Sequence, residues 1–189
     1  MTMMTPVGAG IHGSLYHSHS FDAQATRLPG WKIVMPSNPR DAYGMLLSAM
    51  ADPNPAMVLL PKALMRAKAE EPYEVIPGEP EQARELRKRI DAPIGDRTGW
   101  VPDWPETELD MVPFGKARTL RAGSDLTVVT YGRLARVAMR VADELQGEGI
   151  SAEVIDLRSL HPYDWDAIVA STRKTGRVLF LNEDTEITN

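Results

Sequence analysis

Residues 31–60, WKIVMPSNPRDAYGMLLSAMADPNPAMVLL, decide the fold. The run WKIVMP (31–36) is short, apolar and closed by proline, which predicts a buried strand. Residues 37–50 follow with N-cap oxygens, a proline suited to a first helical turn and an apolar stripe at helical spacing. The turn DPNP (52–55) ends this helix, and AMVLL (56–60) predicts the next strand. Together they form a βαβ unit, whose two strands are normally parallel.

A second α/β unit begins near residue 114, after a strand-like TPV (5–7) and the unit just described. DLTVVTYG (125–132), SAEVIDL (151–157) and RVLFLNE (177–183) predict three strands. An amphipathic helix over 133–146 and a helix capped by Asp164 and ended by Gly176 separate them. The order βαβαβ predicts a parallel sheet with helices on both faces.

The segment between the two units differs from them in composition. A helical stretch at 62–69 leads away from the first unit, and a polar helix is expected at about 80–90. The run DAPIGDRTGWVPDWPETELD (91–110) is rich in proline, glycine and tryptophan, which indicates an ordered loop that packs against another part of the protein. A surface insertion without function is favoured over a substrate lid.

Composition excludes several classes of protein. The 189 residues are 43% hydrophobic and 25% charged, as in ordinary globular chains, and no apolar run approaches the ~20 residues that span a bilayer. The net charge of −5 argues against a nucleic-acid binder, and the basic cluster at 84–89 is interpreted as a solvated helix face. There is no cysteine and no secretory signal pattern, which together fit a cytoplasmic protein.

Three of the four histidines, His12, His17 and His19, lie close together. An imidazole suits proton transfer near neutral pH, but loop residues or a weak metal site would give the same pattern, and the residues alone do not rank the three. His161 precedes a proline in a strand-to-helix turn and is interpreted as structural. Asp156 and Arg158, at a strand end, are interpreted as packing residues more readily than as a catalytic pair.

Residues 13–66, GSLYHSHSFDAQATRLPGWKIVMPSNPRDAYGMLLSAMADPNPAMVLLPKALMR, resemble the pyrimidine-binding domain of the β subunits of thiamine-diphosphate-dependent pyruvate and branched-chain 2-oxo acid dehydrogenases. The shared features are the His-Ser-x-Ser motif, the Pro-Gly before the strand and the D-x-N-P turn. GSDLTVVTYG (123–132), GISAEVIDLRSLHPYDWDAI (149–168) and STRKTGRVLFLNE (171–183) resemble the family's transketolase-type C-terminal domain.

The resemblance implies an α/β fold with three parts. Residues 1–77 are expected to be the C-terminal part of a pyrimidine-binding domain, 78–112 an inserted linker, and 113–189 the N-terminal part of a transketolase C-terminal-like domain. Two features depart from the family: the extra residues from Tyr73 to Glu108, and Leu60 where an acidic residue usually precedes Pro-Lys.

The resemblance also implies the chemistry. His17 matches the family's active-site histidine, which is thought to assist reductive acylation of a lipoyl group, and His19 falls at the family's usual glutamine. The cofactor is expected to be thiamine diphosphate with Mg²⁺ held mostly by an α subunit, and no diphosphate-binding motif appears in this chain. Backbone carbonyls of Ala49, Asp52 and Asn54 match a potassium site, although a plain helix-stopping turn explains them equally well.

The expected function is the decarboxylating component of a 2-oxo acid dehydrogenase complex, which acts on a branched-chain oxo acid or pyruvate and transfers the acyl group to lipoamide. The expected partners are an α subunit in an α2β2 assembly and a lipoyl-bearing acyltransferase, with neither nucleic acid nor membrane. This chain alone is expected to lack a complete active site. Two alternatives stay open: an enzyme resembling transketolase or deoxyxylulose-phosphate synthase, and an inactive truncated association fragment.

Overall fold

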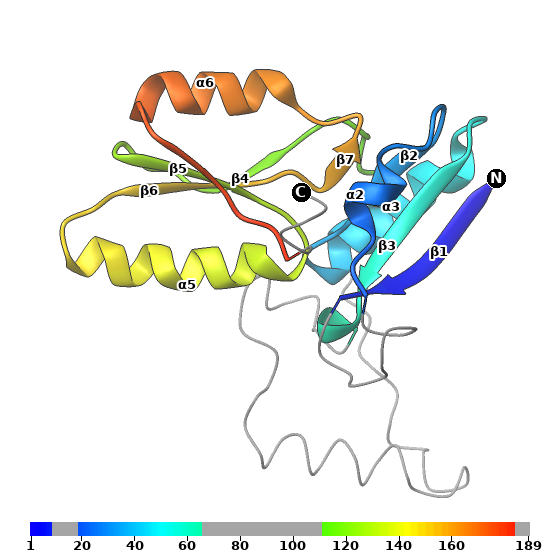
Figure 1. Ribbon diagram of the computed structural model, residues 1–189, viewed down its shortest axis with the longest axis horizontal. Helices are drawn as coiled ribbons and strands as arrows, with labels where there is room; N and C mark the ends of the chain where they lie inside the picture. Colours follow the sequence, from blue (N-terminus) through cyan, green and yellow to red (C-terminus); the bar gives the residue numbers. More distant parts are fainter. Residues whose placement is uncertain (9–18, 66–110, 184–189) are drawn as a thin grey trace, which may run out of the picture.

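The computed structural model describes residues 1–8, 19–65 and 111–183, which form two four-stranded sheets lying side by side (Figure 1). In the first sheet the strand order is β1-β3-β2-β7, and in the second it is β4-β6-β5-β8. The predicted helix at 80–90, the run at 91–110 and the basic cluster at 84–89 lie outside the described residues. The domain boundary between residues 77 and 78 lies there too and stays a prediction.

The first sheet is built on the predicted βαβ unit. Its strands are β1 (Thr2–Val7), β2 (Lys32–Val34) and β3 (Ala56–Pro61), and all three are parallel. Helix α3 (Pro39–Ala51) connects β2 to β3, and its N-cap is Asn38, whose side-chain oxygen accepts a 2.8 Å hydrogen bond from the Asp41 amide. The two strands and the helix predicted from residues 31–60 are therefore confirmed.

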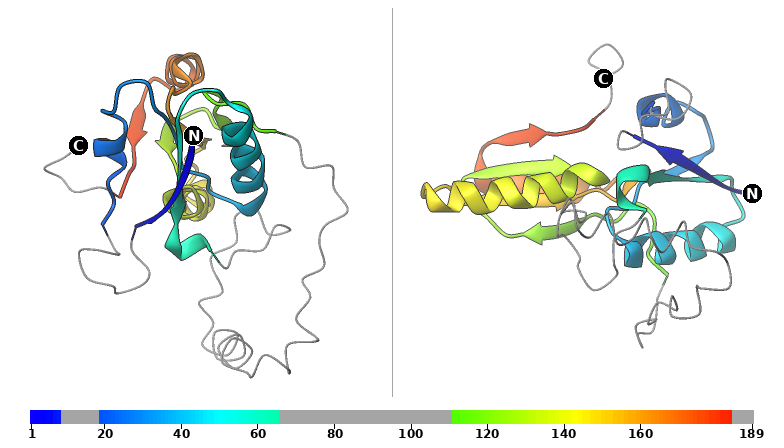
Figure 2. Two further views of the ribbon diagram at one scale, coloured as in Figure 1. Left: turned by 90° about the vertical axis from the view of Figure 1, so that its right-hand side faces the viewer. Right: turned by 90° about the horizontal axis from the view of Figure 1, so that it is seen from below.

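Side chains alternate between the two faces of this sheet. Val7, Ile33, Met57 and Leu59 pack on one face with the short helix α2 (Asp22–Ala25), and Val34, Ala56 and Val58 pack on the other with α3. Figure 2 shows α2 and α3 on opposite sides of the sheet. This alternation is why the strand sequences are continuously apolar, because each residue is covered on its own side.

The second sheet contains the three predicted strands and one that was not predicted. The strands β5 (Leu126–Thr130), β6 (Ala152–Asp156) and β8 (Val178–Phe180) are parallel, as expected. Helices α5 (Arg133–Gly147) and α6 (Trp165–Thr175) cover opposite faces (Figure 1). Strand β4 (Arg118–Arg121) pairs antiparallel with β6, so the prediction of a purely parallel sheet was wrong at this edge.

The caps of α6 follow the sequence. Asp164 accepts a 3.2 Å hydrogen bond from the Ala167 amide at the start of the helix, and Gly176 closes it in a left-handed conformation with φ of 70°. After Pro61, the predicted helical stretch begins as a single 3-10 turn, η1 (Lys62–Leu64), and its remainder from residue 66 lies outside the described residues. No helix in the described ranges is long and apolar enough to cross a membrane.

A short strand of the second unit belongs to the first sheet. Strand β7 (Ser159–His161) pairs antiparallel with β2, next to a cis peptide bond between His161 and Pro162. His161, which its sequence position indicated to be structural, lies in this pairing opposite Ile33. The two units are thus joined by shared backbone hydrogen bonds as well as by side chains.

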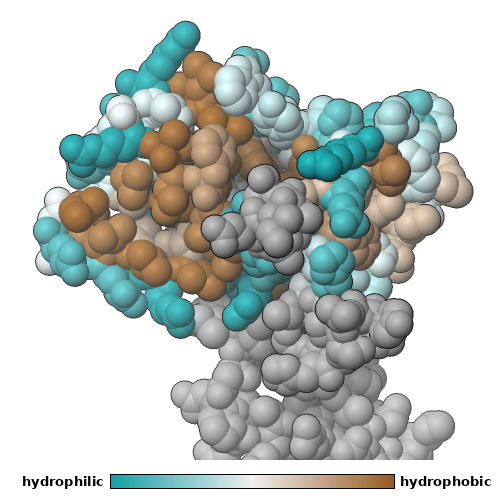
Figure 3. Space-filling view, in the orientation of Figure 1, coloured by the Kyte–Doolittle hydropathy of each residue, from teal (hydrophilic) through white to brown (hydrophobic). Residues whose placement is uncertain are grey.

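The outer face of β8 carries apolar side chains. Val178, Leu179 and Phe180 are all exposed, and Figure 3 shows a broad hydrophobic surface over this side of the second sheet. Among the described residues β8 pairs only with β5 and forms the edge of its sheet. The sequence predicted a strand here, and its side chains are exposed because no described element covers them.

Candidate functional site

The carboxyl ends of the parallel strands meet at the junction of the two sheets. In Figure 1 the arrowheads of β1, β3 and β8 point into this region. Parallel α/β sheets commonly bind ligands at the carboxyl ends of their strands, where loops and helix N-termini converge. The segment that carries His12 and His17 leaves the described residues after Gly8, at the end of β1, and returns at His19. Both histidines themselves lie outside the described residues.

Asp22 lies shortly after His19, where the described chain resumes, and connects this part of the chain to the second sheet. Its carboxylate is buried and accepts hydrogen bonds from the Ser20 hydroxyl, at 2.8 Å, and from the Tyr131 hydroxyl. Tyr131 follows directly after β5, whereas Ser20 and Asp22 stand at the start of α2. The contact therefore ties the chain just after the predicted histidine motif to the end of a strand in the other unit.

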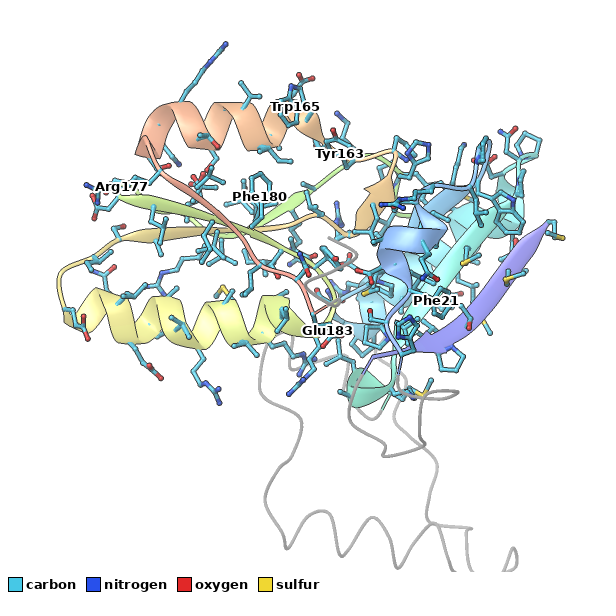
Figure 4. All side chains as sticks on the ribbon, in the orientation of Figure 1. Phe21, Tyr163, Trp165, Arg177, Phe180 and Glu183 are labelled. Atoms are coloured by element: carbon cyan, nitrogen blue, oxygen red, sulfur yellow. The ribbon has the colours of Figure 1, made fainter. Side chains whose placement is uncertain are left out.

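Glu183 lies next to Gly8, the last described residue before the segment that carries His17. It lies beyond β8, where it faces Gly8 at the end of β1, and Figure 4 shows it at the junction of the sheets with Phe21 on the facing side. Gly8 has φ of +79°, and a Cβ at this position would stand 2.7 Å from the Glu183 carboxylate. The left-handed backbone favours glycine here, whereas the end of the flexible Glu183 side chain could move away from a Cβ.

The charge state of Glu183 is set by its surroundings. Burial raises the pKa of its carboxyl, the nearby Asp22 raises it further, and the Arg133 guanidinium, 3.8 Å away, opposes both effects. The Glu183 carboxyl therefore lies at a strand end with its pKa above the ordinary value for a glutamate.

An aromatic groove of about 280 Å³ borders Asp22 and Tyr131. Tyr163, which lies just before α6, Trp165 at the start of α6 and Phe180 at the end of β8 contribute to its wall, and all three are labelled in Figure 4. The rings of Tyr163 and Trp165 meet edge to face, with centroids 6.1 Å apart. The groove is largely apolar, and Asp22 is the acidic residue among those that line it.

A second polar cluster lies deeper in the junction. Asp156, at the end of β6, is fully buried and accepts a hydrogen bond from the Ser37 hydroxyl, which lies just before α3. Arg158 donates to Asp41 of α3 at 3.0 Å and to the carbonyl of Lys116 at 3.0 Å. Both residues contact the other unit, so their interpretation as packing residues is supported by position.

Burial dominates the electrostatics of this cluster. Desolvation raises the pKa of Asp156 to about 7, against the hydrogen bond from Ser37, and the negative charge of Asp41 adds to the increase. Asp41 is balanced by Arg158, whereas Asp156 receives hydrogen bonds from Ser37 and the Arg158 amide. The cluster therefore buries, between the two sheets, a carboxyl group whose pKa is about 7.

Two families of known domains match the chain in succession. The transketolase pyrimidine-binding domain matches residues 1–68, and the transketolase C-terminal domain matches residues 115–189. The 2-oxoisovalerate dehydrogenase subunit beta of Bacillus subtilis is 38% identical over 186 residues, covering 98% of this chain and 47% of the relative. The pyruvate dehydrogenase E1 component subunit beta of the same organism is 34% identical and covers 97% of this chain and 46% of the relative.

The chain carries the two transketolase-type domains in succession and is similar over nearly its whole length to β subunits of the 2-oxo acid dehydrogenases. It spans about half the length of the curated relatives it matches. A solved structure of a split-gene transketolase, described as an inactive β4 tetramer, gives a TM-score of 0.67 at 21% identity, covering 97% of this chain and 48% of that one. A Pichia stipitis transketolase gives 0.53 at 14% identity, covering 89% and 21%. At these identities the structures support the fold only.

The cofactor of this transketolase-type family is thiamine diphosphate. Among the described residues there is no group of three or more His, Asp or Glu side chains arranged to hold a metal ion. The acidic groups at the carboxyl ends of the strands, Asp22 and Glu183, are instead engaged with Tyr131 and Arg133. These two groups therefore lie at the junction of the two sheets, at the carboxyl ends of their strands.

The three residues predicted for potassium lie at the end of α3. The Ala49 carbonyl accepts a 2.9 Å hydrogen bond from the Thr2 hydroxyl, and Asp52 is the C-cap. The Asp52 carboxylate pairs with the Lys32 ammonium and accepts from the Asn54 amide, and these contacts lower its pKa to about 2. The helix-end carbonyls suit a hard cation, but the Lys32 charge beside them opposes one.

Sequence reasoning missed Asp22, Tyr131 and Glu183. Tyr131 and Glu183 both follow strands that were predicted, and a systematic search of strand carboxyl ends would have found them. Asp22 carried no such signal, because its helix has four residues and no helical periodicity to reveal it.

Proposed function

We propose that this chain contributes the β-subunit half of the active site of a 2-oxo acid dehydrogenase, which decarboxylates a branched-chain oxo acid or pyruvate and transfers the acyl group to lipoamide. The observation that carries the proposal is the 38% identity to a 2-oxoisovalerate dehydrogenase β subunit over 98% of this chain. The identity to a pyruvate dehydrogenase β subunit is 34%, so the two substrates are separated only by experiment.

The cofactor supplies the carbanion chemistry when it is bound, and the protein supplies position and proton transfer. In the proposed enzyme His17 exchanges a proton with the lipoyl group during acylation. Gly8, against Glu183, and Ser20 with Asp22, against Tyr131, bracket the segment that carries His17. The second unit would thereby fix both ends of the segment on which the histidine stands.

The proposed partners are an α subunit, in an α2β2 assembly, and a lipoyl-bearing acyltransferase. The α subunit would hold most of the Mg²⁺ and the diphosphate. We also propose that K⁺ binds the carbonyls of Ala49, Asp52 and Asn54, and that the enzyme is cytoplasmic. The absence of cysteine fits a reducing compartment.

Transketolase-type chemistry is the alternative that the fold leaves open. The transketolases resemble this chain at 14–21% identity, whereas the dehydrogenase β subunits reach 32–38%. This difference favours the dehydrogenase. An association fragment without activity is the second alternative, because the chain spans about half of its relatives.

The test combines the chain with the α subunit of a branched-chain 2-oxo acid dehydrogenase, thiamine diphosphate and Mg²⁺. Release of CO2 from 3-methyl-2-oxobutanoate and from pyruvate is measured with an artificial electron acceptor, and ketol transfer between sugar phosphates is measured in parallel. Decarboxylation that requires the α subunit is expected. Ketol transfer without decarboxylation would establish the alternative, and full activity without any α subunit would contradict the shared active site.

A further inference from the structure

The groove that Asp22 and Tyr131 border has aromatic walls that solvent reaches. Tyr163, Trp165 and Phe180 are 50%, 58% and 57% exposed, and all three line the groove. In Figure 4 Tyr163 and Trp165 lie at the start of α6, and Phe180 lies on β8. Aromatic rings attract cations as well as apolar groups, because the face of the ring carries partial negative charge. A ligand that enters this groove therefore meets the rings first.

An exposed apolar surface continues from the groove along β8. Val178 and Leu179 precede Phe180 in this strand, and both are exposed at the edge of the described sheet. Figure 3 shows hydrophobic side chains gathered over this side of the second unit. Continuous exposed apolar surface marks sites of protein interaction, and the cores of such interfaces favour aromatic residues and arginine. The groove of about 280 Å³ is small for a cofactor and suits one inserted side chain.

Asp22 gives the groove a negative charge that no described cation pairs with. The residue lines the groove and is 1% exposed. Its carboxylate accepts hydrogen bonds from the hydroxyls of Ser20 and Tyr131, and it forms no ion pair with a lysine or arginine of the described ranges. Neutral donors stabilise a buried carboxylate, but they leave its charge in place. A cation in the groove would supply the missing opposite charge.

The cation nearest to this carboxylate group is engaged elsewhere. Glu183 lies close enough for the negative charge of Asp22 to raise the pKa of its carboxyl. The guanidinium of Arg133 stands 3.8 Å from the Glu183 carboxylate and pairs with that residue. The charge of Asp22 is therefore the one at this junction that attracts an added cation.

We propose that the groove receives an arginine side chain from a partner protein. The planar guanidinium stacks on the exposed rings, and the apolar surface of β8 packs against the residues that flank the arginine. The Asp22 side chain is buried in the groove wall, so its charge attracts the guanidinium through a medium of low dielectric without direct contact. Arginine fits better than lysine, because its flat group is more weakly hydrated. The proposal concerns binding alone and does not depend on the proposed reaction.

Nuclear magnetic resonance titration of the full 189-residue chain tests the proposal with small probes. Nα-acetylarginine methylamide carries the guanidinium, and Nα-acetylcitrulline methylamide has nearly the same shape without the charge. The signals followed are the amides of Leu160 and Ile168, which line the groove, and the indole of Trp165. Saturable shifts are expected, with a dissociation constant at least about fivefold lower for the arginine probe. Nα-acetyllysine methylamide should bind more weakly than the arginine probe.

Three variants complete the experiment. Asp22→Asn removes the charge and should bind the arginine probe no more tightly than the citrulline probe. Trp165→Leu, at an exposed position, should weaken the binding of both. Asp166→Asn is the matched control, because it removes an exposed charge next to Trp165 but outside the groove, and it should bind like the original protein.

Equal binding of the arginine and citrulline probes to the original protein would overturn the proposal, since the groove would then be merely apolar. The absence of saturable shifts would overturn it too, as would unchanged binding in Asp22→Asn or in Trp165→Leu. Lysine binding as tight as arginine would contradict the stacked guanidinium. The comparison of the probes on the original protein needs no variant, so it decides the question even where Asp22→Asn does not fold.

Discussion

The buried carboxylate of Asp156 and the hydroxyl of Ser37 are hydrogen-bonded across the junction of the two sheets, although they stand 119 residues apart in the sequence. Asp156 is the last residue of β6 in the second sheet, and Ser37 lies just before α3 of the first unit. A group buried in this way reports on the docking of the two units, because it regains water when they separate. The pH dependence of stability that Asp156 causes therefore measures the docking of the two units.

Stability is expected to fall as pH rises through the interval between the unfolded and folded pKa values of Asp156. Burial raises the folded pKa from 3.8 to about 7, so the folded protein binds a proton that the unfolded chain has released. The contribution is fully present below the unfolded pKa and is lost as pH approaches about 7, at up to about 1.4 kcal/mol per pH unit.

Urea unfolding across this pH range measures the slope. Asp156→Asn, which keeps the shape and cannot titrate, should flatten it, and Asp125→Asn, at an exposed turn, should leave it unchanged. A slope that is the same in Asp156→Asn and the original protein would show that other groups cause it.

Breaking the pair between Arg158 and Asp41 is expected to cost about 2–4 kcal/mol of unfolding free energy. Their side chains are 12% and 3% exposed, so Arg158→Met leaves the buried Asp41 carboxylate with the more exposed Arg118 guanidinium, 3.9 Å away, as its remaining charged partner among the described residues. The exposed pair of Arg121 with Asp143, which is 70% exposed, provides the control, and Arg121→Met should cost less than about 1 kcal/mol. Chemical denaturation of both variants tests this, and equal losses would contradict the assignment of Arg158 to the interface.

Gly123→Ala is expected to destabilise the second sheet by about 2 kcal/mol or more, because a Cβ there would stand 2.2 Å from the Glu153 amide nitrogen. The close approach is to backbone, which cannot rotate away. Gly147→Ala is the matched change: it lies at the end of α5 with open space around it, and helix propensity predicts a gain of about 0.5–1 kcal/mol. Thermal unfolding measures both variants. A lower melting temperature for Gly123→Ala with a higher one for Gly147→Ala would confirm the close packing at Gly123, and changes in the same direction would contradict it.

His17→Ala, in the protein assembled with its α subunit, is expected to lower the rate of lipoyl acylation on the order of 100-fold. The melting temperature should change little, because the proposed role is proton transfer. His19→Ala, at an exposed neighbouring position, is the comparison and should retain most activity. Unchanged acylation in His17→Ala would remove this residue from the catalytic site.

Potassium is expected to raise the melting temperature relative to choline at equal ionic strength, if the carbonyls at the end of α3 bind it. Lys32→Met should enlarge the increase, because it removes the ammonium that now pairs with Asp52. Lys174→Met removes a separate ion pair with Glu153 and should leave the potassium response unchanged. No difference between the two salts in any of these proteins would argue for a plain helix-stopping turn.

Much of the fold followed from local pattern. The βαβ unit, the helix caps at Asn38 and Asp164 and the three parallel strands of the second sheet were predictable, because apolar runs and capping residues carry that information locally. Strands β4 and β7 were not predictable from such patterns. They have four and three residues, and each pairs with a strand that is distant in sequence.

The candidate site was less accessible to sequence reasoning. The resemblance to the family selected His17, yet the pairs that flank its segment, Gly8 with Glu183 and Asp22 with Tyr131, each join residues that are far apart in the sequence. Proximity of this kind depends on how the two sheets dock, and no local spacing encodes it. The aromatic groove was hidden for the same reason, since the rings that line it come from the end of β5, the start of α6 and the end of β8.

Strand β7 also has a consequence for biosynthesis. During translation the first sheet emerges with the edge of β2 open, and that edge is closed only when Ser159–His161 leave the ribosome. At a synthesis rate of about 5–20 residues per second, an unpaired strand edge persists for several seconds or more. Nascent chains of this length therefore present an unpaired strand edge with which another chain could pair.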